Sequence, residues 1–146
     1  MNPLVPKPGT TYQWLPMEDD ASIDRKIKRL RSLTADIENV YFNIKSERHS
    51  FYQALLSLGD RRVAPAIEAA EQNGGNWRAA VKEAGVDADF FVFRDRSEDP
   101  VLPWDIIDGG MKASFFHAEY DKGLRGEMTM PPKRQKENAR LLPVLN

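Results

Sequence analysis

Two short segments combine polar side chains with tryptophan beside prolines, and they are the strongest candidates for a binding site. The first lies near the amino terminus and contributes Lys7, Gln13 and Trp14. Because prolines stiffen this segment and it leads out of a predicted strand, its side chains could line a ligand crevice at the carboxyl end of that strand. The alternative is a connector in which Trp14 serves as a packing anchor.

The second segment covers residues 102–110 and contributes Trp104, Asp105 and Asp108. A tryptophan can bury a large apolar face, while an aspartate can accept hydrogen bonds from backbone N–H groups in a turn. This segment therefore fits either a structural lock or a contact with a substrate or partner.

Other chemistry-bearing residue types are too few or too dispersed to form a site. The chain has no cysteine, which excludes a thiolate iron–sulfur cluster and a cysteine nucleophile within it. His49 and His117 are its two histidines, and Asp121 follows His117 at a metal-compatible spacing, but two mixed ligands do not make a site. The neighbouring Asp19 and Asp20 fit a helix cap better than an acid–base pair. We predict no catalytic, cofactor-binding or metal-ligating residue.

Hydrophobic periodicity places the first candidate segment in a strand–helix–strand unit. Residues 5–14 are proline-rich and predicted to be extended. Behind the acidic residues 17–22, apolar side chains recur every three or four positions and predict a helix: Ile23, Ile27, Leu30, Leu33 and Ile37. Residues 39–45 alternate between apolar and polar side chains, which predicts a half-buried strand. This order is typical of a parallel crossover.

Three short helices follow, each ended by glycine. The predicted caps and stops are Ser50 and Gly59, Asp60 and Gly74, and Asn76 and Gly85. Residues 90–93 form a dense apolar run that fits either a short strand or a helix end. A last helix is predicted over residues 113–124, where Phe116 and Tyr120 share one face.

The predicted fold class is therefore α+β and predominantly helical. Residues 1–45 would form the strand–helix–strand unit, at the end of a partial β/α barrel; residues 46–126 a small helical subdomain; and residues 127–146 a flexible basic tail. Two strands do not make a stable sheet alone, so later segments, another chain or a second copy should complete it. Exposed strand edges predict a homodimer.

Charge and hydropathy limit the partners. The 21 Lys and Arg residues nearly balance 22 Asp and Glu, giving a formal net charge of −1, so no global positive field attracts nucleic acid. No stretch approaches the ~20 apolar residues of a membrane span, and no secretory signal is recognisable, so we expect a cytoplasmic protein. The basic residues 25–31 fit a solvated helix face, with RNA contact as the alternative.

Both candidate segments belong to a series of motifs that runs from residue 4 to residue 130. In order, the motifs are Val5-Pro6-Lys7-Pro8-Gly9-Thr10 with Gln13-Trp14, Gly59-Asp60-Arg61-Arg62, Trp77 ahead of Ala84-Gly85-Val86-Asp87, Leu102-Pro103-Trp104-Asp105-Ile106-Ile107-Asp108-Gly109, and Phe115-Phe116 with Glu119-Tyr120. Their order and spacing resemble the carboxyl-terminal part of a group of radical S-adenosylmethionine proteins, the Fe–S oxidoreductases often fused to a cobalamin-binding-like domain.

The resemblance implies a fragment that closes the barrel and shapes the substrate side, without catalytic activity of its own. The 4Fe–4S cluster and S-adenosylmethionine would bind to the upstream part of the parent enzyme, which is the implied partner. The alternative is a small helical protein-interaction or adaptor domain that uses the acidic residues 87–108 or the basic helix.

Overall fold

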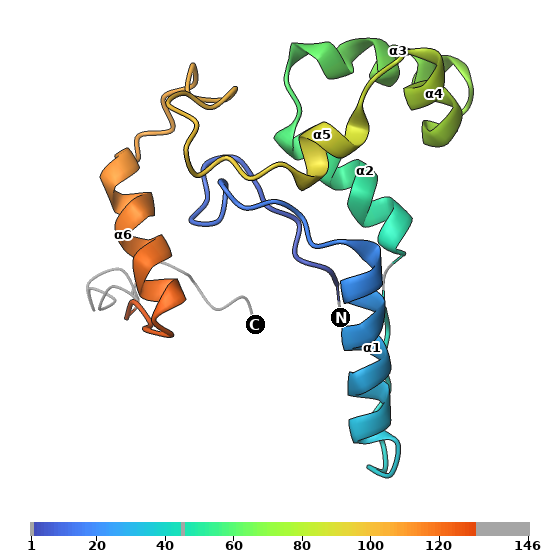
Figure 1. The fold of residues 1–146 in the computed structure, drawn as a ribbon, viewed down its shortest axis with the longest axis vertical. Helices are drawn as coiled ribbons and strands as arrows, with labels where there is room; N and C mark the ends of the chain where they lie inside the picture. Colours follow the sequence, from blue (N-terminus) through green and yellow to red (C-terminus); the bar gives the residue numbers. More distant parts are fainter. Residues whose placement is uncertain (1, 45, 131–146) are drawn as a thin grey trace, which may run out of the picture.

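The computed structural model describes residues 2–44 and 46–130, and within these ranges it contains helices and no strand. The elements are α1 (Asp20–Thr34), α2 (Glu47–Leu58), the 3-10 turn η1 (Arg61–Val63), α3 (Ala64–Gln72), α4 (Trp77–Glu83), α5 (Ala88–Phe93) and α6 (Ala113–Leu124). In Figure 1, α1 and α6 project from a central region of extended chain, and the remaining helices gather on another side of it. None of the described helices is long and apolar enough to cross a membrane.

The prediction of a strand–helix–strand unit and a partial barrel is wrong. Residues 2–7 and 40–44 are extended, but they flank α1 instead of pairing in a sheet, and Leu4 and Ile44 line a groove against the helix. Alternating side chains specify two faces, whereas a strand also needs a neighbour, and prolines remove donors from the first segment. The strand edges behind the expected homodimer are therefore absent from the described chain, and residues 131–146 of the predicted tail lie outside it.

Side-chain caps confirm most of the predicted helix starts. Asp19 and Asn76 each accept a hydrogen bond from the backbone N–H three residues ahead, at 2.9 and 3.2 Å. Asp60 caps the η1 turn that leads into α3. Asp87 caps α5 in the same way, so the apolar run 90–93 belongs to a helix. The predicted start of α2 is wrong, because the helix begins at Glu47, before the predicted cap Ser50.

The apolar face of α1 is only half covered. Ile23 and Ile27 are buried, as the spacing predicts, but Leu33 is 65% exposed. The helix ends at Thr34, so Ile37 lies beyond it and is 54% exposed. The covered half faces the extended segments, since Ile23 and Ile27 line one groove together with Leu4 and Ile44.

The core forms where α2 packs against α5 and the amino-terminal segment lies across them. Leu55, Leu58 and Val92 are fully buried there. Met17 joins this core, and its N–H donates to the Val92 carbonyl at 2.9 Å. A second, close contact joins α3 and α4, and the buried residues on these two helices are alanines, which allow close approach: Ala66, Ala70 and Ala80.

Arg96 is 1% exposed and closes the ends of two helices. Its guanidinium donates hydrogen bonds to the carbonyls of Phe91, of Arg94 at 2.8 Å and of Leu58 at 3.4 Å. Carbonyls at helix carboxyl ends lack intrahelical partners and carry partial negative charge, so a buried cation satisfies them. Burial lowers the pKa of Arg96 from its ordinary value.

We expect Arg96→Ala to destabilise the fold by about 3 kcal/mol, because it leaves buried carbonyls without donors and opens a void. Arg96→Lys should recover only part of this loss, since an ammonium lacks the planar fork that reaches several carbonyls. Urea unfolding followed by circular dichroism measures both. The exposed Arg61 supplies the control, since Arg61→Ala should change stability by less than about 0.5 kcal/mol. Equal stability of Arg96→Ala and Arg61→Ala would contradict this role.

The carboxylate of Asp19 should make the free energy of unfolding depend on pH in the acid range. The hydrogen bond from the Ser22 N–H lowers the pKa of Asp19. A lowered folded-state pKa stabilises the fold above the unfolded pKa, and this contribution disappears as pH falls through the folded pKa. Asp19→Asn keeps a capping oxygen but cannot titrate. Between neutral pH and about pH 3, the urea midpoint should therefore fall more steeply for the wild type than for Asp19→Asn. Parallel curves would exclude the effect.

Candidate functional site

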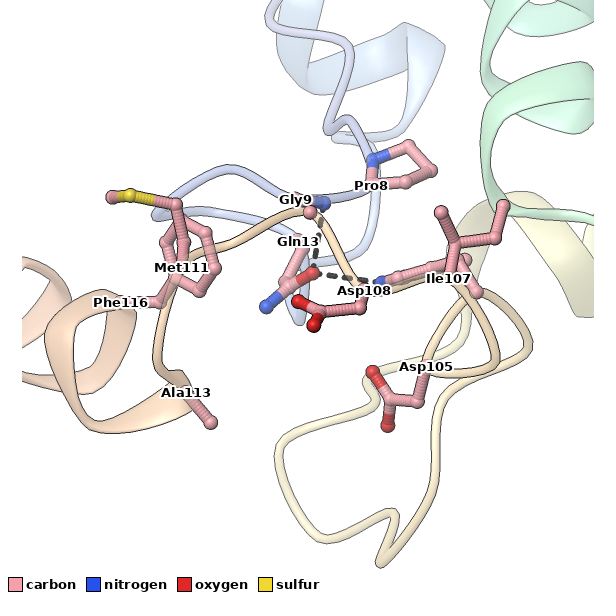
Figure 2. Close-up of a pocket in the computed structure, with 11 residues that line it drawn as sticks. Pro8, Gly9, Gln13, Asp105, Ile107, Asp108, Met111, Ala113 and Phe116 are labelled. Carbon is pink, nitrogen blue, oxygen red and sulfur yellow. Dashed lines mark hydrogen bonds between the residues drawn. The ribbon is translucent and has the colours of Figure 1, made fainter.

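An open pocket of about 500 Å³ lies between the amino-terminal segment, the loop after α5 and the start of α6 (Figure 2). Gln13, Trp104, Asp105 and Asp108 line it, so the structure brings four of the six candidate site residues together. The two segments that sequence analysis singled out separately therefore form one site.

Gln13 joins the two segments. Its side chain is 4% exposed, and its Oε1 accepts hydrogen bonds from the Gly9 N–H at 3.0 Å and the Trp104 Nε1–H at 2.7 Å. Two N–H donors identify the atom between them as the amide oxygen, which fixes the orientation of the amide. The Gln13 Nε2 group must then point away from both donors, toward the pocket (Figure 2).

Asp105 and Asp108 shape the loop as well as the pocket. The Asp105 Oδ2 accepts a hydrogen bond from the Leu102 N–H, and the Asp108 Oδ1 accepts one from the Gly110 N–H, each at 2.8 Å. These bonds match the turn role predicted for the aspartates. Both side chains are exposed and line the pocket, so each carboxylate also presents acceptor capacity there (Figure 2).

Trp14 and Lys7 serve the frame of the pocket. Trp14 is 7% exposed, and its ring stacks on His117 of α6 with centroids 4.2 Å apart. Trp14 is therefore a packing anchor, which was the alternative interpretation of the first candidate segment. The Lys7 Nζ donates to the Ser57 Oγ of α2 at 2.7 Å, and partial burial lowers the pKa of Lys7. Neither side chain lines the pocket.

Aromatic contacts hold α6 in place, since no residue of α6 is fully buried. Tyr12 and Trp14 each contact Tyr120 edge-on, with ring centroids 6.1 Å apart. A Cβ added at Gly123 would lie 2.6 Å from the Tyr12 hydroxyl, so the glycine allows this close approach. The amino-terminal segment therefore positions both the Gln13 amide and the helix that bounds the pocket.

The apolar wall formed by Ile107, Met111 and Phe116 was not predicted from the sequence. Ile107 lies inside the second candidate segment, and Phe116 was predicted to share one helical face with Tyr120. Met111 precedes that helix, in a loop with no periodic signal. Its place at the pocket follows from the stacking of α6 on Trp14, a contact between distant segments.

Acids of the segment 87–108 also order the loop. Five of them accept hydrogen bonds from backbone N–H groups or arginine: Asp87, Asp95, Asp99, Asp105 and Asp108. The Asp99 carboxylate also pairs with Arg94 at 2.8 Å. A hydrogen bond from a backbone N–H leaves the carboxylate charged, so docking through this segment stays a prediction.

The residues of this chain do not fit an iron–sulfur cluster. There is no cysteine to supply thiolates, and in the described ranges no three His, Asp or Glu residues come together to hold a metal ion. His117 stacks on Trp14, and within the described ranges it belongs to no group of three or more possible metal ligands.

Comparison with protein-family models, curated proteins and solved structures found no match for this chain.

The hydrogen bond between Gln13 and Trp104 should be measurable as a coupling energy. In a double-mutant cycle of Gln13→Met and Trp104→Phe, we expect a coupling of about 1 kcal/mol, because either change alone breaks the same bond. Trp77→Phe provides the control: Trp77 stacks on Tyr52 in α2, away from Gln13, so its coupling to Gln13 should be close to zero. Urea denaturation of all variants gives both values. Equal coupling to the two tryptophans would contradict the assignment.

Proposed function

We propose that this chain is the carboxyl-terminal accessory part of a radical S-adenosylmethionine enzyme, which shapes the substrate side and is not catalytic by itself. The observation that carries the proposal is the contact between the motifs behind the resemblance. Gln13 of the first motif and Trp104 of the second are 91 positions apart, yet they share a hydrogen bond at one pocket. Two motifs that meet at one pocket can act on one ligand.

Binding and orientation are the chemistry that the pocket supports. It combines an amide of fixed direction, two carboxylates and an apolar wall. Polar groups held in place by internal hydrogen bonds orient a ligand at little entropic cost. Since the residues of this chain do not fit a cluster, the upstream part of the parent would hold both the cluster and S-adenosylmethionine.

The outer half of α1 is the surface that we assign to contact with the upstream part. Leu33 and Ile37 are more than half exposed, and Tyr41 in the returning chain is 88% exposed. A groove of about 180 Å³ along the earlier turns of α1 is lined by Leu4 and Leu30 among others, and Leu30 precedes Leu33 by one helical turn. An apolar stripe that continues into exposed side chains in this way suits an interaction site.

A helical protein-interaction domain is the second candidate, and the same surface favours it. Exposed basic side chains border the apolar end of α1, including Arg29 and Arg31. They would suit a partner with an acidic, apolar surface. In that case the partner would bind without any dependence on the Gln13 pocket.

Co-expression with the polypeptide encoded directly upstream of Met1, where that frame contains a CxxxCxxC motif, tests the proposal. We expect the two parts to purify together, and anaerobic reconstitution to place the iron–sulfur absorption band in the upstream part and none in this chain alone. Leu33→Asp should abolish co-purification, because it puts a charge into the apolar contact. Leu124→Asp on α6, a site of similar exposure (69%), is the matched control and should not.

A stoichiometric cluster in the isolated chain would overturn the proposal, and so would an upstream frame without the cysteine motif. A partner that lacks this motif, but is lost in Leu33→Asp and retained in Gln13→Met, would instead establish the interaction domain.

A further inference from the structure

The amide nitrogen of Gln13 has no protein hydrogen-bond partner inside the described residues, and it is not one of the fully buried unpaired atoms there, which are the Nε atoms of Arg94 and Arg96. The side chain is 4% exposed, and its hydrogen bonds from Gly9 and Trp104 both end on Oε1. Figure 2 shows the nitrogen directed to the side of the pocket where Ala113 and Phe116 stand. The donor therefore reaches the open space of the pocket, where the acceptor of a ligand can take the place of water.

Two carboxylates line the same pocket as this donor. They belong to Asp105 and Asp108, which come from one loop (Figure 2). One oxygen of each serves its turn, and the second remains for a ligand. Carboxylates accept hydrogen bonds and repel anions, so they favour a neutral or cationic N–H donor and disfavour a ligand carboxylate or phosphate.

The remaining wall is apolar. Ile107, Met111 and Phe116 contribute to it, and Figure 2 shows the Phe116 ring on the side toward which the Gln13 nitrogen points, whereas the Met111 thioether points away from Gln13. An aromatic ring makes favourable contacts with a flat, unsaturated group. The pocket volume of about 500 Å³ is within the range of small-molecule sites.

From these three features we infer that the pocket binds an uncharged amide edge, a carbonyl acceptor next to an N–H donor, carried on a flat apolar body. The carbonyl of the ligand accepts from the Gln13 Nε2–H, its N–H donates to Asp108, and its apolar body lies against Phe116. The identification of this group with the substrate of the parent enzyme rests on the proposed function, whereas its binding does not.

Benzamide is the simplest probe of this chemistry, and two analogues isolate its parts. N,N-dimethylbenzamide keeps the carbonyl and ring but has no N–H, and benzoate replaces the amide with an anion. The chain has 3 tryptophans, so nitrogen-15 spectra give separate indole signals, and Trp104→Phe identifies the one that reports on the pocket. We expect benzamide to shift the Trp104 indole signal saturably and to bind about tenfold more tightly than either analogue.

Variants of the two polar partners separate their contributions. Gln13→Glu keeps an oxygen for Gly9 and Trp104 but loses the donor, and should weaken benzamide binding about tenfold. Asp108→Asn keeps the turn acceptor and removes the charge, so the preference for benzamide over benzoate should shrink severalfold. Asp36→Asn, the same change at an exposed position outside the pocket, should leave the preference unchanged. Circular dichroism checks that each variant is folded.

An amide edge occurs both in peptides and in nucleobases, and two further probes distinguish them. N-acetylphenylalaninamide represents the first source and thymine the second, and the tighter of the two identifies the class. Benzamide that causes no saturable shift in the folded chain, or that binds no better than benzoate, would overturn the inference. A chain that fails to bind benzamide yet co-purifies with the upstream polypeptide would contradict the inference alone, whereas the reverse pattern would contradict only the proposed function.

Discussion

The buried guanidinium of Arg96 fixes the geometry on which the pocket depends. Its side chain binds carbonyls at the ends of α2 and α5, and its backbone N–H donates to the Trp14 carbonyl at 2.9 Å. Arg96 thereby links α2, α5 and the amino-terminal segment to one another. Gln13 directly precedes Trp14, so the direction of its amide follows from the same contact. A buried cation that serves carbonyls rather than a carboxylate is costly to desolvate, and it remains stable only while every acceptor is in place.

Gln13, Asp105 and Asp108 each use one side-chain atom for an internal hydrogen bond and leave another available to a ligand. The Gln13 oxygen holds the loop through Trp104 while its nitrogen faces the cavity. Asp105 and Asp108 each use one carboxylate oxygen for a turn. Internal hydrogen bonds of this kind orient the free atoms before a ligand arrives, so ligand binding orders few side chains. Weakening the frame should therefore reduce ligand affinity as well as stability.

Local signals in the sequence predicted the helices, while contacts between distant segments decided the rest. Caps such as Asp19 and Asn76 act over three residues, and the bounds of α6 agree with the spacing of its aromatic residues. The alternation in residues 39–45 predicted a strand, but the described part of this segment forms none: Ile44 lies at the groove beside α1, and Val40 is 42% exposed. The two site segments stood out individually through their residue types. Gln13 contacts Trp104, whereas Lys7 contacts Ser57 on α2. Both contacts depend on how α2 and α5 pack, and no pattern in the neighbouring sequence predicts them.

The two halves of α1 connect the pocket with the surface that we assign to a partner. Ile23 and Ile27 pack into the same core as Met17, which lies four positions after Gln13, whereas the apolar stripe continues outward to the exposed Leu33. Burying a side chain such as leucine contributes about 2 kcal/mol, so a partner that covers Leu33 and Ile37 would stabilise the whole helix. Because the inner half of α1 shares its core with the segment that carries Gln13, such a partner would also restrict the motion of one wall of the pocket. Assembly and ligand binding should then be coupled, and the coupling must act equally in both directions.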